Sequence, residues 1–281
     1  MQVFNEIAPL KAFLRGRKSA GKSIGLVPTM GALHDGHLAL VQASKAENDI
    51  TVATVFVNPA QFNNPADLEK YPRTLDKDSH LLEKVECDVL FSPGTSQMYD
   101  PDTLVRFDFG HLDKVMEGRF RPGHFSGVAL VVSKLFNIAE PDRAYFGQKD
   151  WQQFVIISQL VRELKFNLKL ISIPTHREAD GLAMSSRNAR LKGRERENAV
   201  VFYQALEFAK FALKTGRSFD EVSDEVRKRV EKLDYITLEY FEIADSENLN
   251  LIDDVKAANR PIMCIAGFVG EVRLIDNMFL D

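Results

Sequence analysis

Apolar residues in the first part of the chain follow two alternating patterns. In some segments the apolar residues recur at the three- and four-residue spacing of a helix. In others they form short β-branched or apolar runs, which are typical of buried strands. Helices are predicted near residues 7–14, 37–48, 74–87, 127–139 and 150–164, and strands near residues 24–28, 50–57, 89–91, 144–146 and 168–173. Strands that alternate with helices favour a parallel sheet with helices on both faces. The pattern therefore predicts an α/β fold.

The pattern changes after Pro174, where a polar stretch begins. Two helical patterns follow over residues 197–215 and 219–233, and then three strand-like runs over residues 237–243, 262–268 and 271–275. The last two runs meet at Gly270, which predicts a hairpin. We therefore place a domain boundary near Pro174 and expect two domains, one over residues 1–174 and a smaller α+β domain over residues 175–281.

Composition limits the partners of the chain. Its 281 residues are 45% hydrophobic and 27% charged, which is typical of a globular protein and excludes a disordered or low-complexity chain. Lys and Arg total 36 against 40 Asp and Glu, a formal net charge of -4. This balance provides no general attraction to nucleic acid or to an anionic membrane. Any anion-binding site must therefore be a local cluster of donors.

Two further features predict a cytoplasmic protein. The cysteines, Cys87 and Cys264, lie far apart and form no CxxC pair, so we expect two reduced structural thiols. Polar residues and a proline interrupt the first apolar residues, which a signal peptide would not tolerate. No apolar run reaches the length of a transmembrane helix.

The segment Gly16–Ser23, GRKSAGKS, matches the phosphate-binding pattern GxxxxGK[ST]. That mechanism needs a strand before the loop and a helix after it, so that backbone amides and the helix dipole meet the phosphates. Here a helical pattern precedes Gly16 and a strand follows Ser23. We therefore interpret the segment as a solvated basic turn.

A better candidate lies in Val27–Val41, VPTMGALHDGHLALV, which follows a strand and opens a helix. Ligands of parallel sheets bind beyond the carboxyl ends of the strands, where free amides at a helix start also point. His34 and His37 fall at this place, and two imidazoles can donate hydrogen bonds to phosphate oxygens. A metal pair and a purely structural turn remain alternatives, since HxxH alone is a weak pattern.

Two other segments favour the phosphate interpretation. GQKDWQQ, Gly147–Gln153, again follows a strand and opens a helix. In it Lys149 is a cation for phosphate, Asp150 a hard oxygen ligand for Mg²⁺, and Gln153 a neutral donor and acceptor. MSSRN, residues 184–188, supplies two hydroxyls and an arginine. The alternatives are a decorated helix start for the first segment and a serine N-cap for the second.

A fourth segment, VFVNPAQF at residues 55–62, ends the second strand with an apolar wall and two amide side chains. A surface turn explains Asn58 and Pro59 well. It does not explain Gln61 and Phe62, so the apolar wall with amide side chains remains the functional interpretation.

These four segments together with MEGRFRPGHFSGV, in this order and at these separations, resemble the pantoate–β-alanine ligase family. The resemblance covers residues 24–190 closely and the C-terminal hairpin more loosely. It implies a Rossmann-like domain of the nucleotidylyltransferase type, a smaller C-terminal lid domain and a homodimer. Within that superfamily, the HxGH and MSSR elements resemble the HIGH and KMSKS elements of class I aminoacyl-tRNA synthetases.

The resemblance also implies the reaction. ATP and pantoate give pantoyl adenylate and pyrophosphate, and the amine of β-alanine then attacks the adenylate to give pantothenate and AMP. The substrate carboxylate is the first nucleophile, which agrees with the lack of a convincing catalytic triad. The small-molecule partners are thus ATP, pantoate and β-alanine, with Mg²⁺ as the metal and neither nucleic acid nor membrane as a partner.

Site residues follow from the same motifs. The resemblance implies four catalytic residues, which are His34, His37, Lys149 and Arg187. His37 would be the proton donor. ATP would contact Met30, Gly31, His34, His37, Gly147, Gln148, Lys149, Asp150, His176, Met184, Ser185, Ser186 and Arg187. The substrate would contact Phe56, Asn58, Gln61, Phe62 and Gln153, and Asp150 would hold Mg²⁺.

Two positions depart from the family pattern. Gln148 stands where many relatives carry Glu. His176 stands at a position that is usually apolar, where family members contact adenine through the backbone. Its side chain either stacks on the base or faces solvent, and we favour the second. Arg119 and Arg121 are either pyrophosphate ligands or surface charge, and they stay outside the predicted site.

Two other functions compete with the ligase. A different adenylyl-transfer enzyme acting on tRNA is disfavoured by the charge balance and by the length of the chain. A nucleotide sensor without activity would use the same fold, because fold alone does not fix function.

Overall fold

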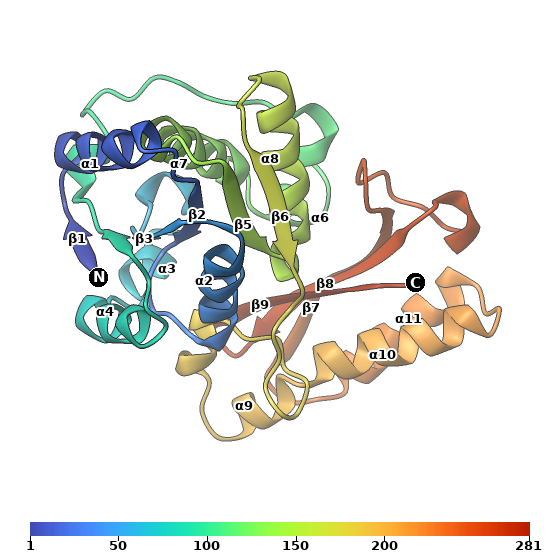
Figure 1. Ribbon diagram of the computed structural model, residues 1–281. Coiled ribbons are helices and arrows are strands. Elements are labelled where there is room, and N and C mark those ends of the chain that lie inside the picture. Colours follow the sequence, from blue (N-terminus) through green and yellow to red (C-terminus); the bar gives the residue numbers. More distant parts are fainter.

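Six parallel strands form the larger sheet in the computed structural model, which describes residues 1–281 (Figure 1). The strands are β1 (Gln2–Phe4), β2 (Ile24–Thr29), β3 (Ile50–Val55), β4 (Val89–Phe91), β5 (Arg143–Gly147) and β6 (Lys169–Ile173). Their order across the sheet is β1-β4-β3-β2-β5-β6. The predicted parallel sheet is confirmed, while β1 was not predicted because only three largely exposed residues form it.

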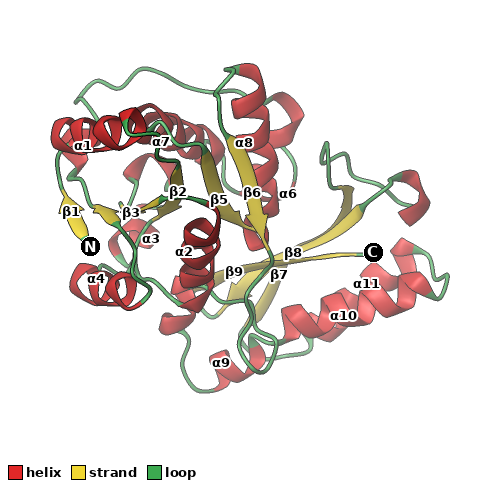
Figure 2. Ribbon diagram, viewed as in Figure 1, coloured by secondary structure: helices red, strands yellow, loops and turns green.

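Helices cover both faces of this sheet (Figure 2). The main ones are α1 (Ile7–Ser19), α2 (Asp35–Glu47), α4 (Leu75–Lys84), α7 (His124–Ala139) and α8 (Trp151–Glu163). Leu26 packs with α1, α7 and α8, whereas its neighbour Val27 packs with α2 and α4. In β5, Phe146 and Tyr145 divide between the same two layers. Because successive strand residues face opposite sides, both faces need apolar residues, which explains the continuous apolar runs.

Short elements, which sequence periodicity cannot detect, connect the larger ones. They are α3 (Pro65–Glu69), α5 (Thr95–Met98), α6 (Met116–Phe120) and 3-10 turns at Pro59–Gln61, Gly110–Asp113, Gln148–Asp150, Ser186–Arg190 and Val255–Ala257. Several of these turns follow a strand of the sheet, so they lie where candidate site residues were predicted.

The part of the chain after Pro174 forms a three-stranded antiparallel sheet with helices. The elements are α9 (Arg194–Asn198), α10 (Val201–Lys214), α11 (Phe219–Glu231), β7 (Ile236–Asp245), β8 (Pro261–Val269) and β9 (Val272–Phe279). Val269 pairs with Val272, and Gly270 adopts a φ of 57°, so the predicted hairpin is confirmed. The helix predicted from residue 197 begins at Val201, after the separate short helix α9.

The antiparallel sheet packs directly against α6 and α8. Trp151 and Ile156 of α8 share an apolar cluster with Ile262 and Cys264 of β8. The Trp151 indole also donates a hydrogen bond to the Ser246 carbonyl at 2.9 Å. This contact sets the position of the second sheet beside the helix that starts at the GQKD segment.

Three expectations about individual features are also settled. At the GRKSAGKS segment α1 ends at Ser19 and β2 begins at Ile24, and Lys22 pairs with Asp49 at 3.0 Å, so the basic turn is confirmed. Both cysteines are free and buried. None of the helices combines the length and the apolar character that crossing a bilayer requires.

We expect Gly127→Ala to destabilise the protein. A Cβ at this position of α7 would lie 2.1 Å from the carbonyl oxygen of Ala60, so the helix or the neighbouring turn must shift. Overpacking of this kind lowers the free energy of unfolding by about 1–3 kcal/mol, which urea titration would measure.

Gly16→Ala is the matched control. It also replaces a helical glycine, but a Cβ there meets nothing within 4 Å, so we expect unchanged or slightly higher stability. Equal effects of the two substitutions would contradict the close contact at Gly127.

Candidate active site

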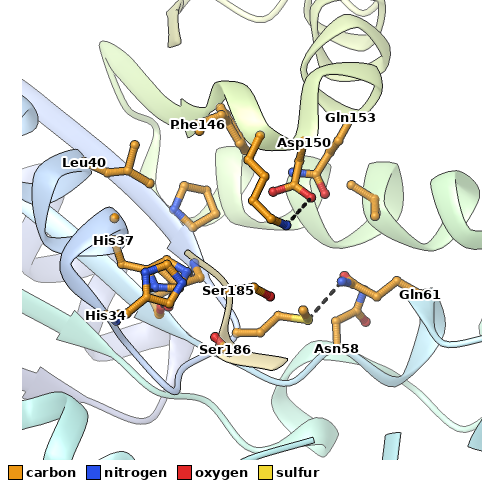
Figure 3. Close-up of a pocket in the computed structure, with 18 of the residues that line it drawn as sticks. His34, His37, Leu40, Asn58, Gln61, Phe146, Asp150, Gln153, Ser185 and Ser186 are labelled. Atoms are coloured by element: carbon orange, nitrogen blue, oxygen red, sulfur yellow. Dashed lines mark hydrogen bonds and ion pairs between the residues drawn. The ribbon is translucent and has the colours of Figure 1, made fainter. Parts of the chain in front are cut away.

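A cavity of about 210 Å³ lies where the carboxyl ends of β2, β3, β5 and β6 meet. This main cavity collects nearly all of the predicted site residues (Figure 3). Those that line it are Met30, His34, His37, Phe56, Asn58, Gln61, Gly147, Lys149, Asp150, Gln153, His176, Met184, Ser185, Ser186 and Arg187. Ligands of parallel sheets bind at such an edge, so the location agrees with a substrate site.

Three predicted residues do not line the main cavity. Phe62 packs edge-on against Tyr71, with ring centroids 5.7 Å apart, and Tyr71 is the ring that reaches the cavity. The Gln148 side chain lies toward Ser172 at 3.5 Å, away from the site, as its departure from the family pattern allows. Gly31 adopts a φ of 83° in the turn after β2.

The turn after β2 carries the imidazole pair. Ala32 has a φ of 49°, in the left-handed region, and the amides of Ala32 and Leu33 donate to the buried Asp78 carboxylate at 2.9 and 2.8 Å. These bonds fix the turn that leads into α2. His34 is the residue just before this helix, and its ring centroid lies 4.0 Å from that of His37.

Both imidazoles are neutral near pH 7. Burial and the nearby Lys149 lower the pKa of His34 to about 4, and burial and His34 lower the pKa of His37 well below its usual value. The amide of His34 donates to Nδ1 of His37 at 3.3 Å, so this nitrogen carries no proton. The proton of neutral His37 therefore lies on Nε2, where it can be donated to a ligand.

Lys149 lies in the turn after β5, where both its backbone and its side chain have polar partners. The buried side chain of Asn277, on β9, donates to the carbonyl oxygens of Gln148 and Lys149 at 2.9 and 2.8 Å. The Lys149 ammonium lies 4.0 Å from the Asp150 carboxylate, and only 18% of the Lys149 side chain is exposed. The site thus contains a mostly buried cation whose backbone is fixed by the second sheet.

Amide groups form the opposite wall, at the end of β3. Asn58 donates to the Oε1 atom of Gln61 at 2.9 Å and accepts from the Tyr99 hydroxyl at 2.7 Å. The amide nitrogen of Gln61 reaches only the Met30 sulfur, at 2.9 Å. Since a thioether is a weak acceptor, this amide is available to a stronger one, such as a substrate carboxylate or hydroxyl.

The MSSRN segment approaches the cavity from the far side. Ser185 accepts from the amide of Arg187 at 3.2 Å, so the predicted serine cap is confirmed, and Ser186 donates to the Ala32 carbonyl at 2.9 Å. Arg187 pairs with Asp67 of α3 at 2.7 Å, and Arg190 pairs with the same carboxylate at 3.0 Å. Two cations share one anion, so this group keeps one net positive charge.

His176 has an exposed side chain at the edge of the cavity, and its carbonyl accepts from the Met184 amide at 3.0 Å. This exposure is what we expected for a histidine at this position. The backbone pairing places His176 and the MSSRN segment side by side.

The main cavity is also lined by Tyr71, Arg121 and His124, which the predicted site did not include. Arg121 and His124 belong to the motif MEGRFRPGHFSGV. Nothing in this motif indicates that Arg121, rather than the nearby Arg119, would reach the site. The structure does: Arg119 is exposed and does not line the main cavity, whereas Arg121 is mostly buried and lines it.

Comparison with known proteins gives consistent results. The family model for pantoate-beta-alanine ligase matches residues 2–279. A pantothenate synthetase of Bacteroides thetaiotaomicron is 48% identical over 279 residues, which cover 99% of this chain and 98% of that protein. The crystal structure of pantothenate synthetase from Thermus thermophilus superposes with a TM-score of 0.93 at 40% identity, covering 100% of this chain and 99% of that one.

A third relative was solved with ligands. The crystal structure of pantoate-beta-alanine ligase from Francisella tularensis, complexed with beta-gamma ATP and β-alanine, has a TM-score of 0.83 at 36% identity. The match covers 100% of this chain and 98% of that one.

We expect Asn277→Asp to lower turnover by at least about tenfold. A carboxylate cannot donate to the two carbonyls, and it repels them, so the turn carrying Lys149 must shift, and shifts of about 1 Å cost up to about a hundredfold. Steady-state kinetics at saturating substrates would measure the loss. Asn250→Asp, at an exposed position of the same half, is the matched control. Unchanged turnover in Asn277→Asp, with the protein folded, would contradict the positioning role.

Proposed function

The chain belongs to the pantoate–β-alanine ligase family, and we propose that its main cavity carries out the ligation through an enzyme-bound pantoyl adenylate. The overall reaction, which joins pantoate to β-alanine with ATP as co-substrate, is the activity of the family. The observation that carries the proposed route is the lining of this one cavity. It combines imidazole, ammonium and hydroxyl donors, which suit phosphate, with neutral amides, which suit the hydroxyls and carboxylate of pantoate.

In this proposal ATP binds to the imidazole, ammonium and hydroxyl donors. His34, His37, Lys149 and the hydroxyls of Ser185 and Ser186 contact the phosphates. Met30, Gly147, His176 and Met184 line the nucleotide site, and Arg187 approaches while it stays paired with Asp67. The family member solved with beta-gamma ATP and β-alanine supports ATP as the nucleotide in this proposal.

Pantoate binds to the neutral amides. Gln61 and Gln153 bind its hydroxyls and carboxylate, Asn58 orients Gln61, and Phe56 packs against its methyl groups. The carboxylate attacks the α-phosphorus, and pyrophosphate leaves. The amine of β-alanine then attacks the acyl carbon, the bond to AMP breaks, and the amine loses a proton. No protein side chain acts as a nucleophile.

Mg²⁺ fits the donor set at this site. The structure contains no cluster of three His, Cys, Asp or Glu ligands. Mg²⁺ in nucleotide sites commonly uses only one or two carboxylates, with phosphate oxygens and water completing its shell. The half-exposed Asp150 carboxylate at the cavity edge meets that need. When bound, the ion would offset negative charge on the phosphates.

Three broader features are part of the proposal. The change from the parallel to the antiparallel sheet supports a domain boundary near Pro174, with residues 1–174 and 175–281 supplying opposite walls of the cavity. A homodimer is implied by the family resemblance. A cytoplasmic location agrees with two free, buried cysteines.

Isotope exchange tests the adenylate directly. With ATP, Mg²⁺ and pantoate but without β-alanine, labelled pyrophosphate should enter ATP, and omission of pantoate should stop the exchange. We expect Lys149→Ala to lower the exchange rate by at least about a hundredfold, the scale of one lost transition-state donor. Lys228→Ala, at an exposed position on α11, is the matched control. Pantoate-independent release of ADP would overturn the proposal.

Gln153→Ala should mainly weaken pantoate binding. Figure 3 shows Gln153 beside Asp150, across the cavity from the imidazole pair. Loss of one substrate hydrogen bond typically costs about 0.5–1.5 kcal/mol, so we expect the KM for pantoate to rise about threefold to tenfold. Calorimetry should find ATP binding unchanged. Equal weakening of both ligands would show that the assignment is wrong.

A further inference from the structure

A second cavity, of about 30 Å³, adjoins the main one. Both cavities share five lining residues, which are Arg121, His124, Lys149, Asp150 and Gln153. The remaining wall includes Glu117 on α6, and Tyr240 and Asn277 on the antiparallel sheet. A water needs roughly 10–15 Å³, so the second cavity has room for about two such groups, such as the two oxygens of one carboxylate.

Arg121 lines both cavities, and several of its N–H donors have no hydrogen-bond partner. Its side chain is only 16% exposed, and its Nη1 atom makes one hydrogen bond, to Nε2 of His124 at 3.1 Å. The nearest carboxylate, Glu117, lies 3.5 Å away and already accepts from Arg273 at 2.6 and 2.8 Å and from Tyr240 at 3.0 Å. A guanidinium has five N–H donors, so most of those of Arg121 remain available.

His124 fixes the orientation of this guanidinium. Its Nδ1 atom lies 2.8 Å from the carbonyl oxygen of Gln61, which can only accept, so Nδ1 carries the proton. Burial and Arg121 lower the pKa of His124 to about 3, so the ring stays neutral and Nε2 accepts from Arg121. One ring therefore connects Arg121 to the backbone of a residue that we place at the pantoate site.

The reaction contains one anion that the groups described above leave unbound. The donors of the main cavity serve the phosphates, and the amides serve pantoate. The carboxylate of the amine substrate takes no part in bond formation, yet it must lose water to enter a cavity lined by buried side chains, which is costly without a cation.

We propose that Arg121 binds the carboxylate of β-alanine and that His124 is the positioning residue that aims it. The proposal rests on the adenylate route above. Arginine suits this role because its planar donors match both oxygens of a carboxylate. Anchored there, the substrate directs its amine toward the acyl carbon held between Gln61 and Gln153, where the carbon–nitrogen bond forms and AMP leaves.

A pair of amines tests the proposal. β-Alanine and n-propylamine present similar primary amines, but only β-alanine has a carboxylate, and both give an amide when they attack the adenylate. In Arg121→Ala we expect the KM for β-alanine to rise at least about thirtyfold, the scale of a truncated buried charge pair. The rate with n-propylamine should change by less than about threefold.

Arg119→Ala is the matched control, since it removes an exposed arginine two positions away. It should leave both amines unaffected. If Arg121→Ala slows both amines equally, or leaves the KM for β-alanine unchanged, the carboxylate assignment is overturned.

Pyrophosphate exchange without β-alanine separates this proposal from the adenylate route. Exchange should persist in Arg121→Ala because β-alanine takes no part in it. Loss of exchange in this variant alone would assign Arg121 to ATP or pantoate and overturn the proposal. Absence of exchange in the unsubstituted protein would instead overturn the adenylate route.

Two substitutions test the role of His124. Asn keeps a donor for the Gln61 carbonyl but offers nothing to Arg121, so His124→Asn should raise the KM for β-alanine and spare n-propylamine. In His124→Gln the longer amide reaches toward Arg121 and should restore part of the affinity for β-alanine. A purely structural role predicts equal losses with both amines, which would contradict positioning.

Discussion

The buried carboxylate of Asp78 is the constraint on which the candidate site depends. It accepts the amides of Ala32 and Leu33, which point into the protein because the chain turns there through the left-handed region. Unpaired, these amides would each cost about 1–3 kcal/mol. Two amides and a hydroxyl, rather than a cation, offset the charge of the carboxylate. The turn is therefore held rigidly, and it places His34 and His37 in contact at the start of α2.

The part of the chain after Pro174 both lines the cavity and holds other cavity residues in position. Asn277 reaches across to hold the backbone of Lys149, and Glu117 on α6 is bound to Arg273 on β9. On the other side, the pair between Arg187 and Asp67 joins the MSSRN segment to the loop after β3. These contacts are polar and mostly buried, so they require a defined geometry rather than simple apolar contact. The two halves therefore fix the distances between cations across the cavity.

Sequence periodicity predicted the larger elements because each strand and helix buries a repeating set of residues. The motifs identified most of the residues that line the main cavity. The misses have physical causes. β1 is too short and exposed to show a period. The pair between Arg187 and Asp67 joins residues 120 positions apart, which no local pattern encodes. Arg119 and Arg121 are chemically identical in sequence, and only the fold buries one and exposes the other.

The neutral imidazoles link binding to chemistry in the proposed mechanism. Before nucleotide binds, burial is the main cause that lowers the pKa of His37, and His34 and Lys149 lower it further. Phosphate oxygens bring negative charge to the same place, and an opposite charge within about 4–6 Å raises the pKa of an imidazole. Phosphate charge in the cavity would therefore oppose the effect of burial on the pKa of His37. Since the neutral ring already donates through Nε2, ATP can bind while Nδ1 keeps its hydrogen bond from the His34 amide.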